Sequence, residues 1–340
     1  MNELRDYNIG VIGAGSWGTT LANMLAEKGY RVTLWVYEQE LFEELCKGRR
    51  CNTWYLPDVE LSQGIVFTPD LEQAVSNKQI VLWVTPVKAF SELFRQGLSF
   101  SAADTIHVSA SKGIENETLH TVSEIACAQA HSFDHHRFAV VSGPSFAQEV
   151  SRKLPTAVVI ASRDPESAAA VQRVMATPYF RTYTSDDVRG VELGGALKNV
   201  IAIASGAVEG LGLGHNTRAA LITRGLAEII RLGMLLGATP RTFAGLSGMG
   251  DLVLTCTSSL SRNFRVGCEL GKGRRLEDIL QGMKMVAEGV YTTRSAYEIA
   301  RTSDIDMPIV GEIYRVLFED KPLQEAVRDL MGRDLKQETV

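Results

Sequence analysis

The chain is poor in the features that mark secreted, membrane-spanning and nucleic-acid-binding proteins. Five cysteines occur among 340 residues, an odd number without a Cys-x-x-Cys pair, which is typical of reduced thiols. Lysine and arginine total 35 against 40 aspartate and glutamate residues, and this net charge of −5 argues against a nucleic acid partner. Long apolar runs are interrupted by charges before they reach the ~20 residues that span a bilayer. The polar start of the chain does not resemble a signal peptide. We therefore expect a cytoplasmic protein without membrane insertion.

Candidate metal ligands are also scarce. The six histidines include His131, His135 and His136, whose polar surroundings are typical of a loop rather than of a metal site. We therefore expect no metal cofactor.

Apolar residues, in contrast, are plentiful, and their pattern changes along the chain. Hydrophobic residues make up 45% of the sequence, and the length predicts about two domains at roughly 150 residues each. The first half alternates short β-rich runs with amphipathic segments, which predicts a Rossmann-like, doubly wound, mainly parallel sheet. The expected strands are 8–12, 31–36, 65–68, 79–84, 105–109, 137–142 and 156–161.

Strand patterns end near residue 185, and helical patterns follow. We expect an α/β dinucleotide-binding domain over 1–187 and an all-helical substrate-binding and catalytic domain over 188–340. Within the predicted helix 216–236, Arg224 and Glu228 have the spacing of an i,i+4 ion pair. The expected helices are 188–208, 216–236, 276–281, 292–302 and 309–318.

A glycine-rich turn is the strongest local motif. Gly13–Gly18 reads GAGSWG, follows the predicted strand 8–12 and opens a predicted helix. Such glycines allow a tight turn, backbone approach to a pyrophosphate and close helix–strand packing. The helix N-terminus then offers N–H groups to the phosphates. In this strand–turn–helix context the motif predicts a dinucleotide site.

The choice between NAD and NADP stays open at this level. Glu38 lies about 20 residues after the motif, where an acidic side chain commonly holds the ribose 2′-hydroxyl of NAD. Arg49 and Arg50 follow, and either could meet a 2′-phosphate or belong to a solvated loop.

Lys198 has an unusual setting for a lysine. In a helix its neighbours one turn away are Gly194, Gly195, Ile201 and Ala202, a small and apolar face. Glycines weaken a helix by roughly 1 kcal/mol each, so a close approach is expected there. A desolvated lysine has a lowered pKa, which suits a general base; the alternative is a lysine whose amine reaches solvent.

Other polar groups occur where ligands commonly bind. Asp251 ends the glycine-rich turn 245–250, and Ser261-Arg262-Asn263 could bind a phosphate through the arginine fork. Lys112 and the segment 142–147 each follow a predicted strand, where doubly wound sheets bind ligands. Each could also be an ordinary turn or helix start.

Taken together, these motifs resemble the bacterial-type NAD(P)-dependent glycerol-3-phosphate dehydrogenases over nearly the whole chain. The motifs that carry the resemblance are GAGSWG at 13–18, SKG at 111–113, SGPS at 142–145, GGALKNV at 194–200, ALITRG at 220–225, GMGDL at 248–252, TCT at 255–257, SRN at 261–263 and VAEG at 286–289.

The resemblance implies reversible hydride transfer between dihydroxyacetone phosphate and sn-glycerol 3-phosphate, which supplies phospholipid synthesis. It implies that Lys198 is the proton acceptor and donor at C2, with Asp251 and Lys112 as catalytic groups beside it. A homodimer and an NAD(P)H cofactor are also implied. The implied substrate-binding residues are Lys112, Gly143, Ser145, Lys198, Asp251, Ser261, Arg262 and Asn263, with Asn199 and Thr255 in support. The implied cofactor-binding residues are Gly13, Gly15, Ser16, Trp17, Gly18, Tyr37, Lys112, Ala147, Arg262, Val286 and Glu288.

The sequence departs from the family after the predicted strand 31–36. The family usually has histidine or arginine there, whereas this chain has Tyr37 and then Glu38. Tyrosine offers a 2′-phosphate no charge, and a carboxylate repels it. Two other interpretations remain: a β-hydroxyacid or 6-phosphogluconate-type dehydrogenase, and a non-catalytic NAD(H) sensor. The GMGD and SRN motifs argue against the first, and the missing basic footprint against the second.

Overall fold

A computed structural model describes residues 7–48, 50–129, 133–283, 285–335 and 337–338. Contacts within the chain divide it into two compact units. Unit 1 comprises 1–111 and 122–188, and unit 2 comprises 112–121 and 189–340. The short segment 112–121 interrupts unit 1 in the sequence but belongs to unit 2. Lys112 is therefore a residue of unit 2.

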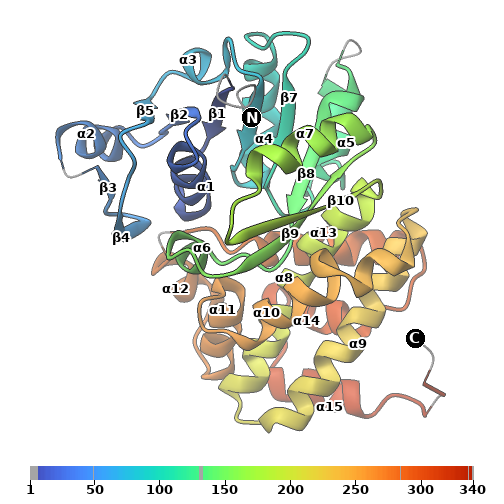
Figure 1. Ribbon diagram of the computed structural model, residues 1–340. Helices are drawn as coiled ribbons and strands as arrows, with labels where there is room; N and C mark the ends of the chain where they lie inside the picture. The colour runs from blue at the N-terminus through green and yellow to red at the C-terminus, as the bar shows by residue number, and fades with distance from the viewer. Residues whose placement is uncertain (1–6, 49, 130–132, 284, 336, 339–340) are drawn as a thin grey trace. The chain divides into compact units, whose positions relative to one another are not determined.

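Unit 1 is built on an eight-stranded sheet with the order β10-β9-β8-β7-β6-β1-β2-β5 (Figure 1). All neighbouring pairs are parallel except β8 and β9. The chain leaves β1 toward β2 on one side and later returns to β6 on the other, so the sheet has a switch point at the end of β1. The strands are β1 (Asn8–Ile12), β2 (Arg31–Trp35), β5 (Ile65–Thr68), β6 (Ile80–Trp83), β7 (Ile106–Ser109), β8 (Phe138–Ser142), β9 (Thr156–Ser162) and β10 (Phe180–Ser185).

The central strands are almost continuously apolar because they are buried on both faces, as parallel strands covered by helices are. The predicted doubly wound α/β class is confirmed, although β10 was not predicted. The helices of this unit are α1 (Ser16–Glu27), α2 (Gln39–Lys47), α3 (Leu71–Val75), α4 (Val87–Leu98), α5 (Val122–Gln129), α6 (Ala147–Ser151) and α7 (Pro165–Met175).

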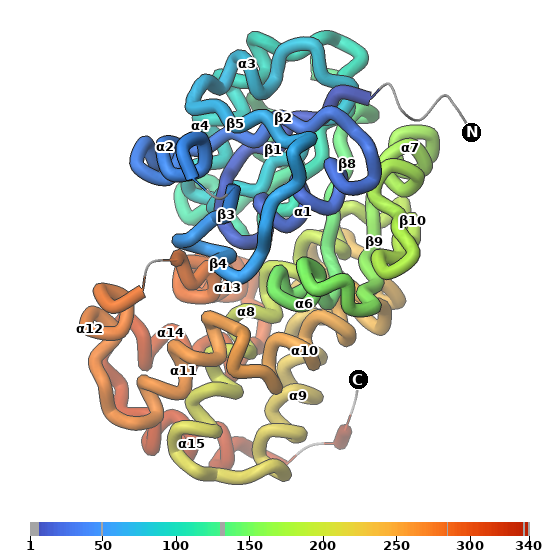
Figure 2. The backbone as a smooth tube through the Cα atoms, turned by 60° about the vertical axis from the view of Figure 1, so that its left-hand side comes forward, coloured from blue at the N-terminus to red at the C-terminus, as the bar shows by residue number. Residues whose placement is uncertain are grey.

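A two-stranded hairpin, also unpredicted, lies outside the main sheet. It consists of β3 (Cys51–Asn52) and β4 (Leu56–Glu60), and Figure 2 shows it beside α2 and α1.

Unit 2 is helical, as predicted. Its central helix α8 (Val188–Gly210) is long and apolar enough to cross a membrane, but its most hydrophobic stretch is entirely buried inside the protein. The core around α8 includes Leu197, Ile201, Phe243 and Val266. The other helices are α9 (Gly214–Leu235), α10 (Asp251–Thr257), α11 (Arg262–Gly271), α12 (Leu276–Gln281), α13 (Glu288–Thr302), α14 (Pro308–Phe318) and α15 (Leu323–Met331).

The predicted pairing of Glu228 with Arg224 is not what the structure contains. The Glu228 carboxylate is buried and accepts hydrogen bonds from the backbone N–H groups of Ile309 and Val310 at 2.7 and 3.1 Å. Glu228 therefore caps the N-terminus of α14, whose first N–H groups have no partner within the helix.

Candidate active site

The glycine-rich turn lies at the switch point of the sheet in unit 1. Gly13 has φ of +113°, and a Cβ there would lie 2.6 Å from the carbonyl oxygen of Val84, just beyond β6. A Cβ on Gly18 would collide with the carbonyl oxygen of Gly13 at 1.9 Å. These two glycines are required by the fold of the turn itself.

Gly15 has a different role. A Cβ on Gly15 would meet no described atom within 4 Å beyond its chain neighbours, so sterics within the chain do not demand a glycine. Gly15 is the N-cap of α1 and has no side chain to accept from the first N–H groups of the helix. The turn thus leaves space and hydrogen-bond donors at a helix N-terminus, which fits the pyrophosphate of a dinucleotide.

The end of β2 places Tyr37 and Glu38 next in the chain. Tyr37 is 77% exposed, with its ring 5.8 Å from that of Trp35. Glu38 is the N-cap of α2, and its Oε1 accepts a hydrogen bond of 2.8 Å from the hydroxyl of Tyr55. Arg50 is held elsewhere, donating from Nη2 to the carbonyl oxygens of Ser62 and Ile65. Arg49 lies outside the described residues.

Four other candidate residues of unit 1 follow β8 or lie at the start of α1. Gly143 has φ of +145°, and its carbonyl oxygen accepts from the hydroxyl of Ser145 at 2.9 Å. The carbonyl oxygen of Ala147, at the start of α6, accepts a 3.4 Å hydrogen bond from Thr20 of α1. Trp17 is half-buried, with its ring 6.4 Å from that of Phe180. The structure thus brings Ala147 next to the helix that follows the glycine-rich turn.

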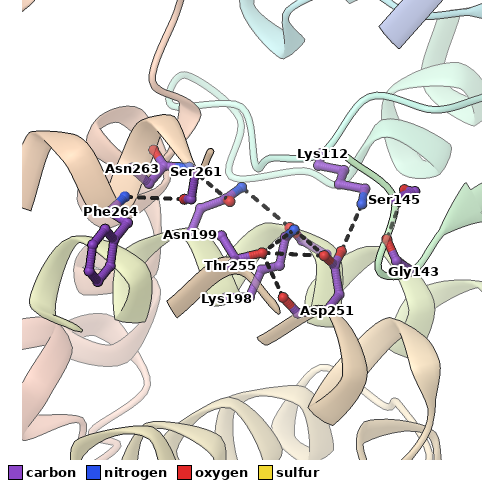
Figure 3. Close-up of polar contacts among 11 residues, drawn as sticks. Lys112, Gly143, Ser145, Lys198, Asn199, Asp251, Thr255, Ser261, Asn263 and Phe264 are labelled. Atoms are coloured by element: carbon purple, nitrogen blue, oxygen red, sulfur yellow. Dashed lines mark hydrogen bonds and ion pairs between the residues drawn. The ribbon is translucent and has the colours of Figure 1, made fainter. Parts of the chain in front are cut away.

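In unit 2, two lysines converge on one buried carboxylate (Figure 3). Lys198 on α8 donates from Nζ to Oδ1 of Asp251 at 2.5 Å, and Lys112 donates from Nζ to Oδ2 at 2.7 Å. Lys198 also donates to Oγ1 of Thr255 at 2.8 Å. The Asp251 side chain is 2% exposed and that of Lys198 8%, whereas that of Lys112 is 20% exposed. The alternative of a Lys198 amine that reaches solvent is therefore excluded.

A close backbone approach explains this convergence. A Cβ on Gly194 would lie 2.5 Å from the carbonyl oxygen of Ser247, so the two backbones meet where α8 has a glycine. Lys198 lies four residues after Gly194, and Asp251 four residues after Ser247, at the start of α10. The turn before Asp251 is π-helical over Leu246–Gly250, a rare form that is frequent at functional sites. One close contact thus brings lysine and carboxylate together one helical turn later.

The environment shifts the pKa of both Lys198 and Asp251. Burial lowers the pKa of Lys198 to about 8, with a further reduction from Lys112 and an opposing increase from Asp251. Burial alone would raise the pKa of Asp251, but the charges and hydrogen bonds of the two lysines outweigh it, and the net shift is downward. Near neutral pH, Asp251 is ionised and Lys198 can both donate and accept a proton.

The Ser261-Arg262-Asn263 motif begins α11, where two of its side chains already bind within unit 2. Ser261 is the N-cap and accepts from the backbone N–H of Phe264 at 3.2 Å. Asn263 donates to Oδ1 of Asn199 at 2.9 Å and accepts from the N–H of Gly289 at 3.0 Å. The side chain of Asn263 therefore links α11 to α8 and α13, next to the position of Lys198 in the sequence of α8.

Arg262 is half-buried and lies within the field of Glu288, the first residue of α13. Burial lowers the pKa of Arg262, and Glu288 partly offsets that reduction. A guanidinium that is poorly hydrated is well suited to bind a phosphate. Val286, two residues before Glu288, is 38% exposed.

Among the described residues, no group of three or more histidine, cysteine, aspartate or glutamate side chains could hold a metal ion. The ring centres of His135 and His136 lie 4.5 Å apart and the rings are tilted by 33°, and His131 lies outside the described residues.

Sequence reasoning missed two residues that support the dinucleotide turn and the end of β2. Asn52 on β3 is buried, and its amide donates to the carbonyl oxygen of Ala14 and to Oγ1 of Thr19, both at 2.8 Å. Tyr55 binds Glu38, as described above. Both belong to the hairpin, and no periodic pattern indicated either one.

Comparison with known proteins gives a consistent result over the whole chain. Residues 8–168 match the family described as NAD-dependent glycerol-3-phosphate dehydrogenase N-terminus, and residues 187–328 match the corresponding C-terminus. The glycerol-3-phosphate dehydrogenases [NAD(P)+] of Geobacter sulfurreducens and Geobacter metallireducens are 57% and 56% identical to this chain. Each alignment covers 97% of this chain and 98% of the relative. The crystal structure of glycerol-3-phosphate dehydrogenase from Coxiella burnetii is also similar, with a TM-score of 0.91, 38% identity, and coverage of 96% of this chain and 99% of that one.

Proposed function

This chain belongs to the family of NAD-dependent glycerol-3-phosphate dehydrogenases, and we propose that Lys198 exchanges the proton at the C2 oxygen of its substrate. The enzyme is an oxidoreductase that interconverts dihydroxyacetone phosphate and glycerol 3-phosphate with NAD(P)H. Membership in this family sets aside the hydroxyacid dehydrogenase and NAD(H)-sensor interpretations.

The residues present fit the cofactor. The space in front of Gly15 and the helix N-terminus behind it match a pyrophosphate, as described above. When bound, the nicotinamide supplies the hydride that adds to C2 during reduction, or accepts it during oxidation. We propose that Gly13, Gly15 and Gly18 form the turn that binds it. Further cofactor contacts are proposed for Ser16, Trp17, Tyr37, Lys112, Ala147, Arg262, Val286 and Glu288.

Lys198 carries the proposed acid–base step. During reduction the Lys198 ammonium gives its proton to the C2 oxygen as that oxygen gains the electron pair of the carbonyl bond. During oxidation the neutral amine takes the proton of the C2 hydroxyl. The observation that carries the proposal is the buried amine of Lys198, held by Asp251 and Thr255. Burial lowers the pKa of Lys198 to about 8, which makes both forms accessible near neutral pH.

Asp251 and Lys112 act on Lys198 and on the charge around it. Asp251 fixes the Lys198 amine through Oδ1 and keeps its pKa from falling further. Lys112, the more exposed of the two lysines, places a second positive charge within the same cluster. We propose that this charge stabilises the oxygen that becomes negative as hydride adds to C2.

The phosphate of the substrate is assigned to Arg262. Within the SRN motif, Ser261 caps α11 and Asn263 binds Asn199. Arg262 is the positively charged side chain of the motif and takes no part in these two contacts, so its guanidinium can bind the phosphate. We propose additional substrate contacts from Gly143, Ser145, Ser261 and Asn263, with Thr255 and Asn199 as supporting groups. The family resemblance further supports a cytoplasmic homodimer that makes glycerol 3-phosphate for phospholipid synthesis.

The proposal for Lys198 is tested by Lys198→Met, which keeps the length of the side chain and removes the proton. We expect kcat for dihydroxyacetone phosphate reduction to fall by about 10²- to 10⁴-fold, the usual contribution of a general acid. Cofactor affinity, followed by quenching of tryptophan fluorescence, should stay within about twofold because all four tryptophans are in unit 1 with the glycine-rich turn.

Lys272→Met is the matched control, since Lys272 is an exposed lysine of unit 2 that pairs with Glu269. It should leave kcat unchanged. A Lys198→Met enzyme that turns over within tenfold of the wild type would assign the proton to another group.

A further inference from the structure

The turn of the β3–β4 hairpin is joined to helix α2 through carboxylates. Thr53 donates from Oγ1 to Oε2 of Glu44 at 2.7 Å, and the indole N–H of Trp54 points to Oε1 of the same residue at 3.4 Å. Tyr55 donates its hydroxyl proton to Oε1 of Glu38 at 2.8 Å. Figure 2 shows the start of the hairpin near α2 within unit 1. Three consecutive side chains of the turn thus bind the N-cap residue of α2 and a second glutamate within the helix.

The same hairpin is anchored to the glycine-rich turn. Asn52, directly before the turn residues, donates to the carbonyl oxygen of Ala14 and to Thr19 Oγ1. Because Asn52 is fully buried and both hydrogen bonds are 2.8 Å long, the hairpin has a fixed position relative to the dinucleotide turn. Tyr55 lies only three positions after this anchor, and its backbone N–H donates to Oδ1 of Asn52 at 3.1 Å, so its position is fixed as well.

Glu38 occupies the position where dinucleotide folds recognise the adenosine ribose. It follows β2 by three residues, and the last residue of β2, Trp35, pairs with Ile12 and accepts a hydrogen bond from the N–H of Gly13. The carboxylate at this point of the fold accepts from the ribose 2′-hydroxyl. A 2′-phosphate in the same place would face a like charge.

A free glutamate side chain is a poor selector because it can rotate away. Ordering it costs up to roughly 2 kcal/mol of rotamer entropy. The hydrogen bond from Tyr55 orders Glu38 before the cofactor arrives and uses Oε1, while Oε2 is not part of that bond. Burial and the neighbouring Glu38 raise the pKa of Tyr55 to about 12, so the phenol keeps the proton that it donates.

Arg50, which the sequence offered as a ligand for a 2′-phosphate, is held by other contacts. Arg50 donates two hydrogen bonds from Nη2, of 2.8 and 2.7 Å, to the carbonyl oxygens of Ser62 and Ile65. Its guanidinium also lies 4.7 Å from the centre of the Phe67 ring. Reorienting it toward a phosphate would leave these carbonyl groups without that donor.

We propose that Tyr55 is a positioning residue that holds the Glu38 carboxylate at the ribose 2′-hydroxyl and thereby makes this enzyme select NADH over NADPH. The inference deepens the proposed function and rests on its placement of the dinucleotide in unit 1.

The test uses the full-length chain and the variants Tyr55→Phe, Glu38→Gln and their combination. Calorimetry gives the affinities for 5′-AMP and 2′,5′-ADP, which differ only at the 2′ position, and fluorescence quenching gives those for NADH and NADPH. We expect the wild type to prefer the unphosphorylated ribose. Tyr55→Phe should reduce that preference by about threefold to tenfold, the net contribution of one ordinary hydrogen bond. Glu38→Gln should reduce it at least as far.

The double variant distinguishes a Tyr55 that positions the Glu38 carboxylate from a Tyr55 that only stabilises the hairpin. If Tyr55 acts through Glu38, adding Tyr55→Phe to Glu38→Gln should leave the preference unchanged, since the carboxylate to be positioned is gone. Thr53→Val is the matched control, because it removes a hydrogen bond between the same hairpin and α2 without touching Glu38. It should keep the wild-type preference.

Three outcomes would overturn the inference. The first is a Tyr55→Phe variant with an unchanged preference for the unphosphorylated ribose. The second is a Tyr55→Phe variant that loses affinity equally for both nucleotides. The third is a Tyr55→Phe change that has the same effect in the wild type and in the Glu38→Gln background. Nucleotide affinities are measured without substrate. Absence of dihydroxyacetone phosphate turnover would therefore refute the proposed function, while the nucleotide preference could still be measured.

Discussion

Lys198 and Asp251 lie 53 positions apart in the sequence, yet their side chains form an ion pair of 2.5 Å in the interior of unit 2. Burial and this pairing act on the lysine in opposite directions. Burial lowers the pKa of Lys198, and the negative charge of Asp251 raises it, with a net value of about 8. The pair therefore sets the pH at which the proposed acid and base forms exchange.

The first prediction concerns the pH dependence of both reaction directions. Reduction requires protonated Lys198, so kcat/KM for dihydroxyacetone phosphate should fall as pH rises through about 8. Oxidation requires the neutral amine, so kcat/KM for glycerol 3-phosphate should rise over the same interval. Asp251→Asn removes the charge that raises the Lys198 pKa, and both transitions should move to lower pH.

At pH 7.5 the Asp251→Asn enzyme should lose about threefold in reduction for the first pH unit of displacement, since the protonated fraction of Lys198 falls from about 0.76 to about 0.24 when its pKa moves from about 8 to about 7. Steady-state rates between pH 6 and 10 measure the effect. Asp278→Asn, a change of an exposed aspartate on α12, is the control. A transition that stays near 8 in Asp251→Asn would show that Asp251 does not control the proton of Lys198.

The second prediction concerns Arg262 as the phosphate-binding group. Arg262→Ala should raise KM for dihydroxyacetone phosphate by about 10²-fold or more, because a partly buried charge pair is lost. The rate with unphosphorylated dihydroxyacetone should change little, since that substrate has no phosphate to lose. Arg265→Ala, at an exposed arginine three residues further along α11, should affect neither substrate. Parallel kinetics with the two substrates decide the matter, and equal losses with both would remove Arg262 from the phosphate.

The parts of the fold that local sequence encodes were predicted. β1, β2 and β6 are apolar runs of four or five residues, and α12 is found over the residues expected. The unusual glycine at position 194 predicted a close approach, which the structure contains against Ser247. In each case the signal lies within one element or one helical turn.

The parts that depend on distant partners were not predicted. β10 buries Phe180 and Thr182 while Tyr183 is exposed, so its apolar residues do not alternate. Its identity as a strand comes from pairing with β9. Glu228 has good spacing for a surface ion pair with Arg224, but 81 residues later α14 offers its N–H groups instead. Tyr55 lies in the three-residue turn between β3 and β4, and its contact with Glu38 becomes visible only in the folded chain. Such contacts leave no periodic signal in the sequence.

The third prediction concerns the acid stability of unit 1 and begins with His107 on β7. The ring is fully buried, with Nδ1 accepting from the indole N–H of Trp83 at 3.1 Å and Nε2 lying 3.0 Å from the hydroxyl of Ser101. These contacts suit the neutral ring with its proton on Nε2, and burial lowers the pKa of His107 to about 3.

The folded-state pKa of His107 thus lies below the unfolded value of about 6.5, and the unfolded chain binds the extra proton. The resulting stability is fully present above pH 6.5 and is lost progressively as pH falls toward 3. At pH 5 the loss should be about 2 kcal/mol.

His107→Gln keeps an acceptor for Trp83 and removes the titration, so its unfolding free energy should lack this component of the pH dependence. His135→Gln, at an exposed histidine, should keep the wild-type slope. Urea unfolding followed by tryptophan emission reports on unit 1 alone, because all four tryptophans belong to it. Equal slopes for wild type and His107→Gln between pH 7 and 5 would show that this histidine is not the group that limits acid stability.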